Sequence, residues 1–349
     1  MFHNLVKRLL SPVDFRASGD NLHAFVLLRV GLSGILLFKL LYELPDFGDL
    51  YGPNGIVPWW ANEISAPSYV PTLSWICSVV NSFGRPLDPE TVAVTAQGAY
   101  AAALVLLLAG HCQRVAAVTV WLLHFVFLSS NRFTLYGVDA FANIGLFFLM
   151  LAPSTANRTR TGGLDVSLWP LLLSTLLRIQ ICVMYAETGW AKAIGPQWWS
   201  GDSLWRALQQ PQFQAVVGTQ WLGSYPTVVK VIGISVIVVE IAYPFVIWIR
   251  KVRLIELILI LIFHLTIMLT LGLWAFGATA IVLNLSAFGI AALQDLRSIL
   301  AFRRPSTGFN DVVLSRSIPG IDDEKRGTVT CGKVGCLLTS RAPEGDELR

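Results

Sequence analysis

The stretch Arg178–Arg206 reads RIQICVMYAETGWAKAIGPQWWSGDSLWR, and the rest of the chain must fold around it. It begins as an apolar helix, breaks at Gly195-Pro196 and continues into a short amphipathic segment. The helix that includes this stretch has 3.6 residues per turn, and six of its polar or small residues fall within about 40° of one line along it. These residues are Ser174, Arg178, Cys182, Tyr185, Gly189 and Lys192.

Gln180 and Glu187 lie on the opposite line of the same helix. Each charge left in hydrocarbon costs at least a few kcal/mol. We therefore expect lipid to contact neither polar line, and we expect this helix to pack inside a bundle. Charged residues at membrane depth are also the first candidates for a functional site.

The composition predicts an all-α, multi-pass membrane protein, because 54% of the residues are hydrophobic and only 14% are charged. Eight apolar runs are long enough to span a bilayer or nearly so, although the fourth is short. The eight runs cover residues 23–44, 91–110, 114–130, 138–152, 168–190, 226–248, 254–272 and 275–294. A further run, Ser68–Phe83, contains Pro71 and is predicted to be a re-entrant or interfacial helix. We expect no cleavable signal peptide, since Met1–Asp20 is polar and amphipathic.

Basic residues predict the orientation of the eight spans. Alternate connections are rich in arginine and lysine, and they come to one side: Lys7, Arg8, Arg16, Arg114, Arg158, Arg160, Arg250, Lys251, Arg253, Arg297, Arg303 and Arg304. The charge asymmetry places this side, with both termini, in the cytoplasm of a cell-membrane protein. Residues 1–294 would form the transmembrane domain and residues 295–349 a disordered cytoplasmic tail. The net charge of +4 thus indicates orientation rather than nucleic-acid binding.

The long exterior connections, Pro45–Glu90 and Gly195–Tyr225, are rich in tryptophan. Their indoles suit either an aromatic belt at the headgroup level or the roof of a cavity. The five cysteines have no zinc-type spacing and are expected to be free thiols, so no metal site is predicted.

Lys192 is the first residue that could carry chemistry. Desolvation by Trp198 and Trp199 would lower the pKa of its amine and make it available as a base. Alternatively, Lys192 is a lysine that extends to water at a helix end.

A second polar group enters the fourth span. Tyr136, Asp139 and Asn143 follow helical spacing, and Asp139 could pair with Lys192, Arg132 or Arg206. Asp139 is equally well placed as an acid that interacts with the dipole at a helix N-terminus.

Further ionisable residues lie within the spans. His264 could relay protons or bind a ligand, or it could be a hydrogen-bonded packing residue, and His124, on one face with Asn131, invites the same two interpretations. Glu240 needs a partner, for which Arg178 is the candidate. Lys39 and Glu43 should form an i, i+4 pair.

Three of these segments together resemble the vitamin K-dependent gamma-carboxylase-like family, whose shared membrane part is the horizontally transferred transmembrane domain. The likeness covers about residues 15–294. Its motifs are Asn131 with Leu135-Tyr136-Gly137, Tyr185 with Gly189-Trp-Ala-Lys192 and Trp198-Trp199-Ser-Gly201, and Phe263-His264 with Phe276.

The resemblance implies an integral membrane carboxylase (a lyase) in which Lys192 deprotonates a reduced, vitamin K-like quinone. Dioxygen and carbon dioxide would be co-substrates, and a glutamate γ-carbon of a secreted peptide or protein would be carboxylated. We expect one exterior site with Lys192, His264 and Asp139 as catalytic residues. Substrate would contact Tyr136, Arg132, Tyr185, Trp198, Trp199 and Arg178. The alternative is a non-enzymatic membrane protein for the maturation, export or immunity of a secreted peptide.

Overall fold

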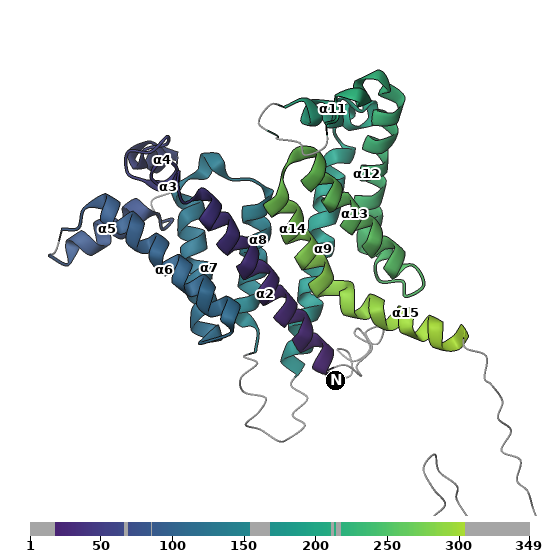
Figure 1. Cartoon of the computed structure of the whole chain (residues 1–349), viewed down its shortest axis with the longest axis horizontal. Coiled ribbons are helices and arrows are strands. Elements are labelled where there is room, and N and C mark those ends of the chain that lie inside the picture. The colour runs from purple at the N-terminus through teal and green to yellow at the C-terminus, as the bar shows by residue number, and fades with distance from the viewer. Residues whose placement is uncertain are drawn as a thin grey trace, which may run out of the picture. The chain divides into compact units, whose positions relative to one another are not determined.

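A computed structural model describes residues 18–65, 69–84, 86–153, 168–210, 213 and 218–303 (Figure 1). Every regular element in this part of the chain is a helix, which confirms the predicted all-α class. The first half contains α2 (Ser18–Glu43), α3 (Phe47–Tyr51), α4 (Trp59–Ser65), α5 (Leu73–Ser82), α6 (Pro89–Ala109), α7 (Gln113–Ser130), η1 (Arg132–Thr134) and α8 (Gly137–Leu151). The second contains α9 (Leu168–Ala193), α10 (Pro196–Ser200), α11 (Asp202–Gln209), η3 (Gln220–Ser224), α12 (Pro226–Val246), α13 (Arg253–Leu271), α14 (Trp274–Asn284), the π-helical turn η4 (Leu285–Gly289) and α15 (Ile290–Arg303).

Each of the eight predicted spans contains a helix, and the molecule is a multi-pass membrane protein. Within the described residues, seven helices have the length and hydropathy of a full span. The eighth, α8, has 15 residues and covers about 22 Å, less than a hydrocarbon core of about 30 Å. It packs against α2, α7 and α14, so protein rather than lipid surrounds much of it.

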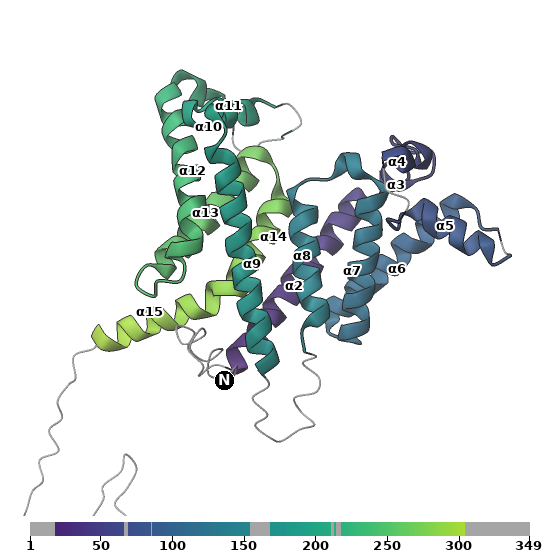
Figure 2. The ribbon, with the colours of Figure 1, turned by 180° about the vertical axis from the view of Figure 1, so that it is seen from behind.

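The first residues of α2 and the whole of α15 lie at the same end of the bundle in both views (Figures 1 and 2). An even number of crossings accounts for this placement, and the cytoplasmic assignment of that end stays a prediction. Residues 295–303, which the sequence analysis placed in the tail, continue α15 as helix. The remainder of the expected tail lies outside the described residues.

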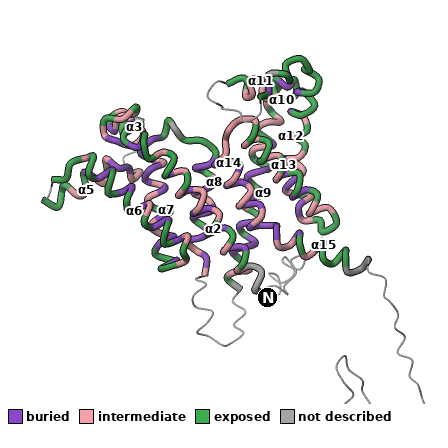
Figure 3. The backbone as a smooth tube through the Cα atoms, viewed as in Figure 1, coloured by how far each residue is buried: buried purple, intermediate pink, exposed green. Residues whose placement is uncertain are grey.

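The polar line of α9 is turned into the bundle, as predicted (Figure 3). Ser174, Cys182 and Tyr185 are buried, and Arg178 and Lys192 are half-buried. The expectation for the opposite line is wrong at Glu187, which is exposed. Glu187 lies less than about two turns from the end of α9, so its carboxylate can reach the interface.

Two glycines let helices approach closely. A Cβ on Gly189 of α9 would lie 2.9 Å from the backbone nitrogen of Ile241 on α12. A Cβ on Gly137 would lie 2.6 Å from the ring of Phe276 on α14. Real Cβ atoms do not make such contacts, so glycine at both positions allows these helices to pack as they do.

The predicted exterior connections are built from short helices. α5 has ten residues, too few to span a bilayer, and Thr72 caps it by accepting a hydrogen bond from the Trp75 amide. The Leu73 amide donates to Ser130 Oγ at 2.7 Å, which holds α5 against the end of α7. The prediction that Ser68–Phe83 is not a ninth span is therefore confirmed for residues 69–83.

Most of the exterior indoles face outward, as in an aromatic belt: Trp60, Trp75, Trp199 and Trp221 are exposed. Trp59 is an exception, since it is buried and donates its Nε1 hydrogen to the Tyr51 carbonyl at 3.0 Å. Among the described cysteines, Cys77, Cys112 and Cys182 are free thiols, as expected. Cys331 and Cys336 lie outside the described residues.

Candidate functional site

Lys192 forms an ion pair with Glu240, and their Nζ and Oε2 atoms are 2.6 Å apart. The pair joins α9 to α12 at the level where Gly189 brings the two backbones together. The Glu240 side chain is 5% exposed and the Lys192 side chain 20%. The ammonium also lies 5.4 Å from the centre of the Trp198 ring. Lys192 therefore faces the bundle and an indole, and it does not extend to water as an interfacial lysine would.

The predicted pair of Arg178 with Glu240 is wrong. Arg178 instead donates its Nε hydrogen to the Ala287 carbonyl at 2.8 Å. Measured from the ends of the two helices, Glu240 and Arg178 have the same depth only if both helices begin and end at the same membrane surfaces. The first half of α12, however, continues past the end of α9 and packs against α10 and α11, which brings Glu240 opposite Lys192.

A chain of buried hydrogen bonds lies next to this pair. The Tyr243 hydroxyl donates to Asn284 Oδ1 at 2.6 Å, and Asn284 Nδ2 donates to the Tyr185 hydroxyl at 2.8 Å. The Tyr185 hydroxyl and His264 Nε2 are 2.7 Å apart. His264 is 2% exposed, and its Nδ1 atom has no partner in the described part of the chain. A buried polar atom without a partner is rare and calls for an explanation.

These residues form one group, called here the α9 cluster: Lys192, Glu240, Tyr185, His264, Asn284 and Tyr243. Tyr185 lies two turns before Lys192 on α9, and Tyr243 lies one turn after Glu240 on α12. The two tyrosine rings are 4.2 Å apart, so the ion pair and the hydrogen-bond chain bridge the same two helices. The sequence analysis placed Lys192, Tyr185 and His264 in one site, and the structure brings these three together.

Asp139 belongs to a different group, the α2 cluster: Lys39, Glu43, Asp139, Tyr100 and His124. Lys39 Nζ lies 2.7 Å from Glu43, which confirms the i, i+4 pair, and 3.8 Å from Asp139. The Tyr100 hydroxyl is 3.0 Å from His124 Nδ1. The cluster lines a cavity of about 30 Å³, which is large enough to hold a water molecule.

The expected pairing of Asp139 with Lys192 is wrong, because each has another partner. The alternative interpretation of Asp139, as an acid at a helix N-terminus, is confirmed. Its Oδ2 atom accepts a hydrogen bond from the Tyr136 amide at 3.2 Å. Tyr136 and Arg132 are exposed just outside α8 and do not join the α9 cluster.

Two tyrosines outside the spans stay protonated near the α2 cluster. Burial and the Glu43 carboxylate raise the pKa of the Tyr51 hydroxyl. Burial and the Asp139 carboxylate raise the pKa of the Tyr136 hydroxyl. Neither phenol can therefore serve as a base at neutral pH.

The predicted single site thus divides in two. Trp198 covers Lys192, whereas Trp199 is exposed and donates its Nε1 hydrogen to the Ala193 carbonyl at 2.7 Å. Phe276 connects the α9 cluster to α8. The Phe276 ring lies 5.7 Å from that of His264 and 5.2 Å from that of Phe141 on α8, and it fills the space beside Gly137.

Three polar partners in the clusters are not among the residues predicted from the sequence: Asn284, Tyr243 and Tyr100. Asn284 had a usable signal, since it is an amide in the middle of the apolar run of the last predicted span. Tyr243 lies one helical turn after Glu240, which also placed it on a polar face. Tyr100 gave no comparable signal, because a tyrosine in a membrane helix is equally consistent with a purely apolar contact.

Fold and buried charges together define a multi-pass α-helical membrane protein with two ionisable clusters inside the bundle. Comparison with protein-family models, with curated proteins and with solved structures gives no match. Within the described residues, no three His, Cys, Asp or Glu side chains are grouped so as to hold a metal ion.

Proposed function

We propose that this protein is a cell-membrane enzyme that removes a proton from a lipid-soluble, weakly acidic substrate, with the Lys192–Glu240 pair as the proton acceptor. The observation that carries this proposal is the 2.6 Å ion pair inside the bundle, in the same cluster as His264, whose Nδ1 atom has no described partner. Buried ionisable groups in membrane helices are costly, and they usually mark proton or substrate pathways.

The pair can accept a proton as a unit. In the resting arrangement the ammonium of Lys192 neutralises the Glu240 carboxylate across a short contact. Removing water around such a pair lowers the cost of the neutral form relative to the charged form, because both charges lose solvation. A proton that moves from Lys192 Nζ to Glu240 Oε2 leaves a neutral amine, which is the form that a lysine base requires. Trp198 keeps one side of the amine away from water.

A reduced quinone, the substrate that the family resemblance implies, fits the polar groups at this site. Its hydroxyl oxygen could satisfy His264 Nδ1, which has no described partner. Lys192 would accept the hydroxyl proton, and Tyr185 would fix the His264 ring through the 2.7 Å contact at Nε2. When bound, the quinol supplies the electrons for the reaction with dioxygen that precedes carboxylation in the resembling family.

The second substrate is a carbon acid such as a peptide glutamate, with carbon dioxide as the carboxyl donor. This assignment follows from the resemblance alone, and the predicted exterior position of Lys192 supports it. A protein or peptide that is being secreted would meet the pair from that side of the membrane.

Mass spectrometry of the purified protein tests the proposal. We expect lipid extracts of the protein from its native membrane to contain a quinone, and the amount to fall when His264 is replaced in His264→Phe. Lys230→Gln, which removes an exposed lysine of α12, should retain the quinone. An extract without quinone, with wild type and His264→Phe alike, would contradict the proposal.

The alternative is a non-enzymatic protein for the maturation, export or immunity of a secreted peptide. It leads to a different prediction. In that case the ion pair only fastens α9 to α12, and Lys192→Arg would retain the biological effect because arginine can also pair with Glu240.

A further inference from the structure

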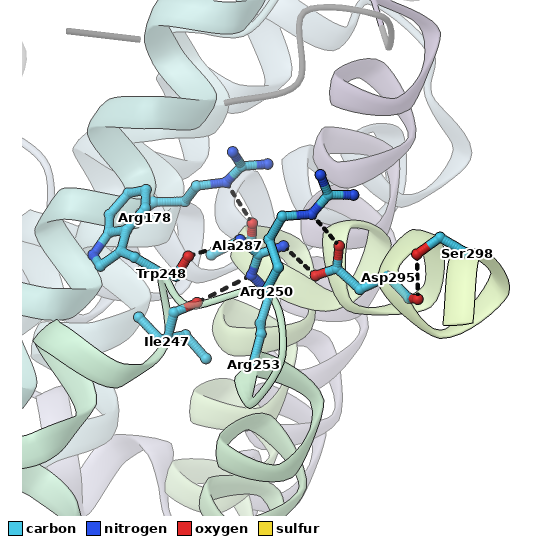
Figure 4. Close-up of polar contacts among 8 residues, drawn as sticks. All are labelled: Arg178, Ile247, Trp248, Arg250, Arg253, Ala287, Asp295 and Ser298. Atoms are coloured by element: carbon cyan, nitrogen blue, oxygen red, sulfur yellow. Dashed lines mark hydrogen bonds and ion pairs between the residues drawn. The ribbon is translucent and has the colours of Figure 1, made fainter. Parts of the chain in front are cut away.

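A group of arginines, Arg178, Arg250 and Arg253, lies around Asp295 and the π-helical turn (Figure 4). Here α9, the turn between α12 and α13, and the beginning of α15 meet. Arg250 Nε is 3.0 Å from Asp295 Oδ1, and Arg253 Nη1 is 2.5 Å from Asp295 Oδ2. Arg253 also donates to the Ile247 and Trp248 carbonyls, so its guanidinium is fully engaged.

Arg178 is the guanidinium in this group that has no acidic partner among the described residues. Its Nε hydrogen bonds to the Ala287 carbonyl of the π-helical turn at 2.8 Å, and its guanidinium carbon lies 5.9 Å from the centre of the Phe288 ring. These two contacts fix the plane of the guanidinium. Neither Nη group donates to another described residue, although Arg178 is only half-exposed.

The Nη groups of Arg178 are available to a ligand, since neither donates to a described residue. Figure 4 shows the Nη atoms of Arg178 and Arg250 turned away from Asp295. The guanidinium edge of Arg178 presents parallel N–H donors, the geometry that suits phosphate oxygens. π-Helical turns within longer helices are frequently found at functional sites.

The position of the arginines matches the depth of lipid headgroups. α15 leaves the bundle at the level of the α12–α13 turn in both views (Figures 1 and 2). It exposes Leu293, Ile299 and Leu300 together with Arg297, a mixture typical of a helix that lies in the membrane interface. Ile249, next to Arg250 in the turn, is also exposed. Acyl chains can therefore contact exposed apolar side chains at the same end of the bundle as the arginines.

We propose that Arg178, flanked by Arg250 and Arg253, binds the phosphate group of an anionic phospholipid in the leaflet at this end of the bundle. The phosphate accepts hydrogen bonds from the Nη groups of Arg178, and its negative charge neutralises an arginine that the described residues leave without an acidic partner. The acyl chains lie along Ile249 and Leu293. Basic pockets between membrane helices commonly bind acidic headgroups in this way, and the predicted cytoplasmic leaflet is the one rich in anionic lipid.

The test uses the full-length protein, delipidated in dodecyl maltoside and titrated with phosphatidylglycerol or phosphatidylcholine, with bound lipid counted by native mass spectrometry. We expect wild type to bind phosphatidylglycerol more tightly than phosphatidylcholine. Arg178→Gln should weaken phosphatidylglycerol binding about tenfold or more, the loss expected for charge-assisted hydrogen bonds. Arg114→Gln removes an exposed arginine on the same predicted side of the membrane, outside the cluster, and should bind as wild type does.

Arg250→Gln keeps the proposal testable if Arg178→Gln does not fold. The Arg250 side chain is 60% exposed, so the variant should fold, and it should also bind phosphatidylglycerol more weakly. Equal binding by wild type and a folded Arg178→Gln or Arg250→Gln would overturn the proposal. Displacement of phosphatidylglycerol by inorganic phosphate alone would also overturn it, because the site would then bind the free anion. The quinone measurements on His264→Phe are independent of all these outcomes.

Discussion

The α2 and α9 clusters both contain a half-buried lysine paired with a carboxylate, but they hold it differently. Lys39 pairs with Glu43 of its own helix, and its second contact, with Asp139, is longer at 3.8 Å. The acidic partner of Lys192 is Glu240, which comes from another helix and lies 2.6 Å away. The first arrangement needs only a helix, whereas the second exists only when α9 and α12 are packed together.

The histidines of the two clusters differ in the same way. Both ring nitrogens of His124 have partners, Tyr100 at 3.0 Å and the Asp139 carbonyl at 3.4 Å. His264 has a partner at Nε2 and none described at Nδ1. The α2 cluster is therefore complete as it stands, and the α9 cluster is the one with a polar atom left for a ligand.

The largest effect should follow from breaking the pair that joins two helices. Glu240→Leu leaves the Lys192 ammonium without its partner, and we expect a loss of about 3–5 kcal/mol in the free energy of unfolding. The double variant Lys192→Met/Glu240→Leu should lose less, because no charge is left unpaired. Equilibrium unfolding in mixed micelles measures both. If the loss of stability in the double variant equals the sum of the losses in Glu240→Leu and Lys192→Met alone, the two residues do not interact.

Lys192→Arg tests proton acceptance by Lys192 while keeping an ion pair with Glu240. Arginine can bond Glu240 and should preserve stability, but it stays protonated and cannot accept a substrate proton. We expect quinol-dependent turnover to fall by about 100-fold, the usual size of a lost general base. Turnover is measured with membranes that contain equal amounts of protein, and Lys230→Gln is the control. Full activity in Lys192→Arg would leave the lysine a structural role only.

Gly189→Ala tests whether close helix contact positions the pair. The added Cβ would lie 2.9 Å from the Ile241 nitrogen and 3.0 Å from Glu240 Cβ, so α9 and α12 must separate. We expect a loss of about 1–3 kcal/mol, the usual cost of overpacking. Gly98→Ala in α6 is the matched control, since no atom lies within 4 Å of its Cβ position, and it should be neutral or slightly stabilising. Equal stabilities for both variants would contradict the packing argument.

Lys39→Met should have the smallest effect of the four. An i, i+4 pair contributes roughly 0.5 kcal/mol, and the nearby cavity lets water solvate the carboxylates that remain. We expect a loss of about 1 kcal/mol, measured under the conditions used for Glu240→Leu. If Lys39→Met were the more damaging of the two, the distinction between a local and an interhelical pair would fail.

The helices of this protein could be predicted from the sequence because their signals are local. Apolar runs and helical spacing identified every span and the buried line of α9. The pairing of charges could not be predicted equally well, because it depends on how far one helix is shifted along another. Glu240 and Arg178 have similar distances to the ends of their apolar runs, but α12 begins beyond the end of α9, in contact with α10 and α11.

The division of the predicted site has a similar cause. Asp139 and Lys192 both lie near the predicted exterior ends of their spans, and depth alone cannot show which helices are neighbours. α8 packs chiefly against α7 and α14, whereas α9 packs chiefly against α12. Lys39 was recognised as the partner of Glu43, but its contact with Asp139 requires α2 and α8 to lie together, which no local pattern reveals.

The Phe276 ring, which contacts both His264 and the space beside Gly137, connects the α9 cluster to the first turn of α8. A ligand that displaces the ring from His264 must also change its contact with α8, two residues before Asp139. The free-energy cost of moving the ring therefore depends on its packing both at His264 and at Gly137. A change in packing at Gly137 and a ligand at His264 would then alter each other's free energies by the same amount, as reciprocal linkage requires.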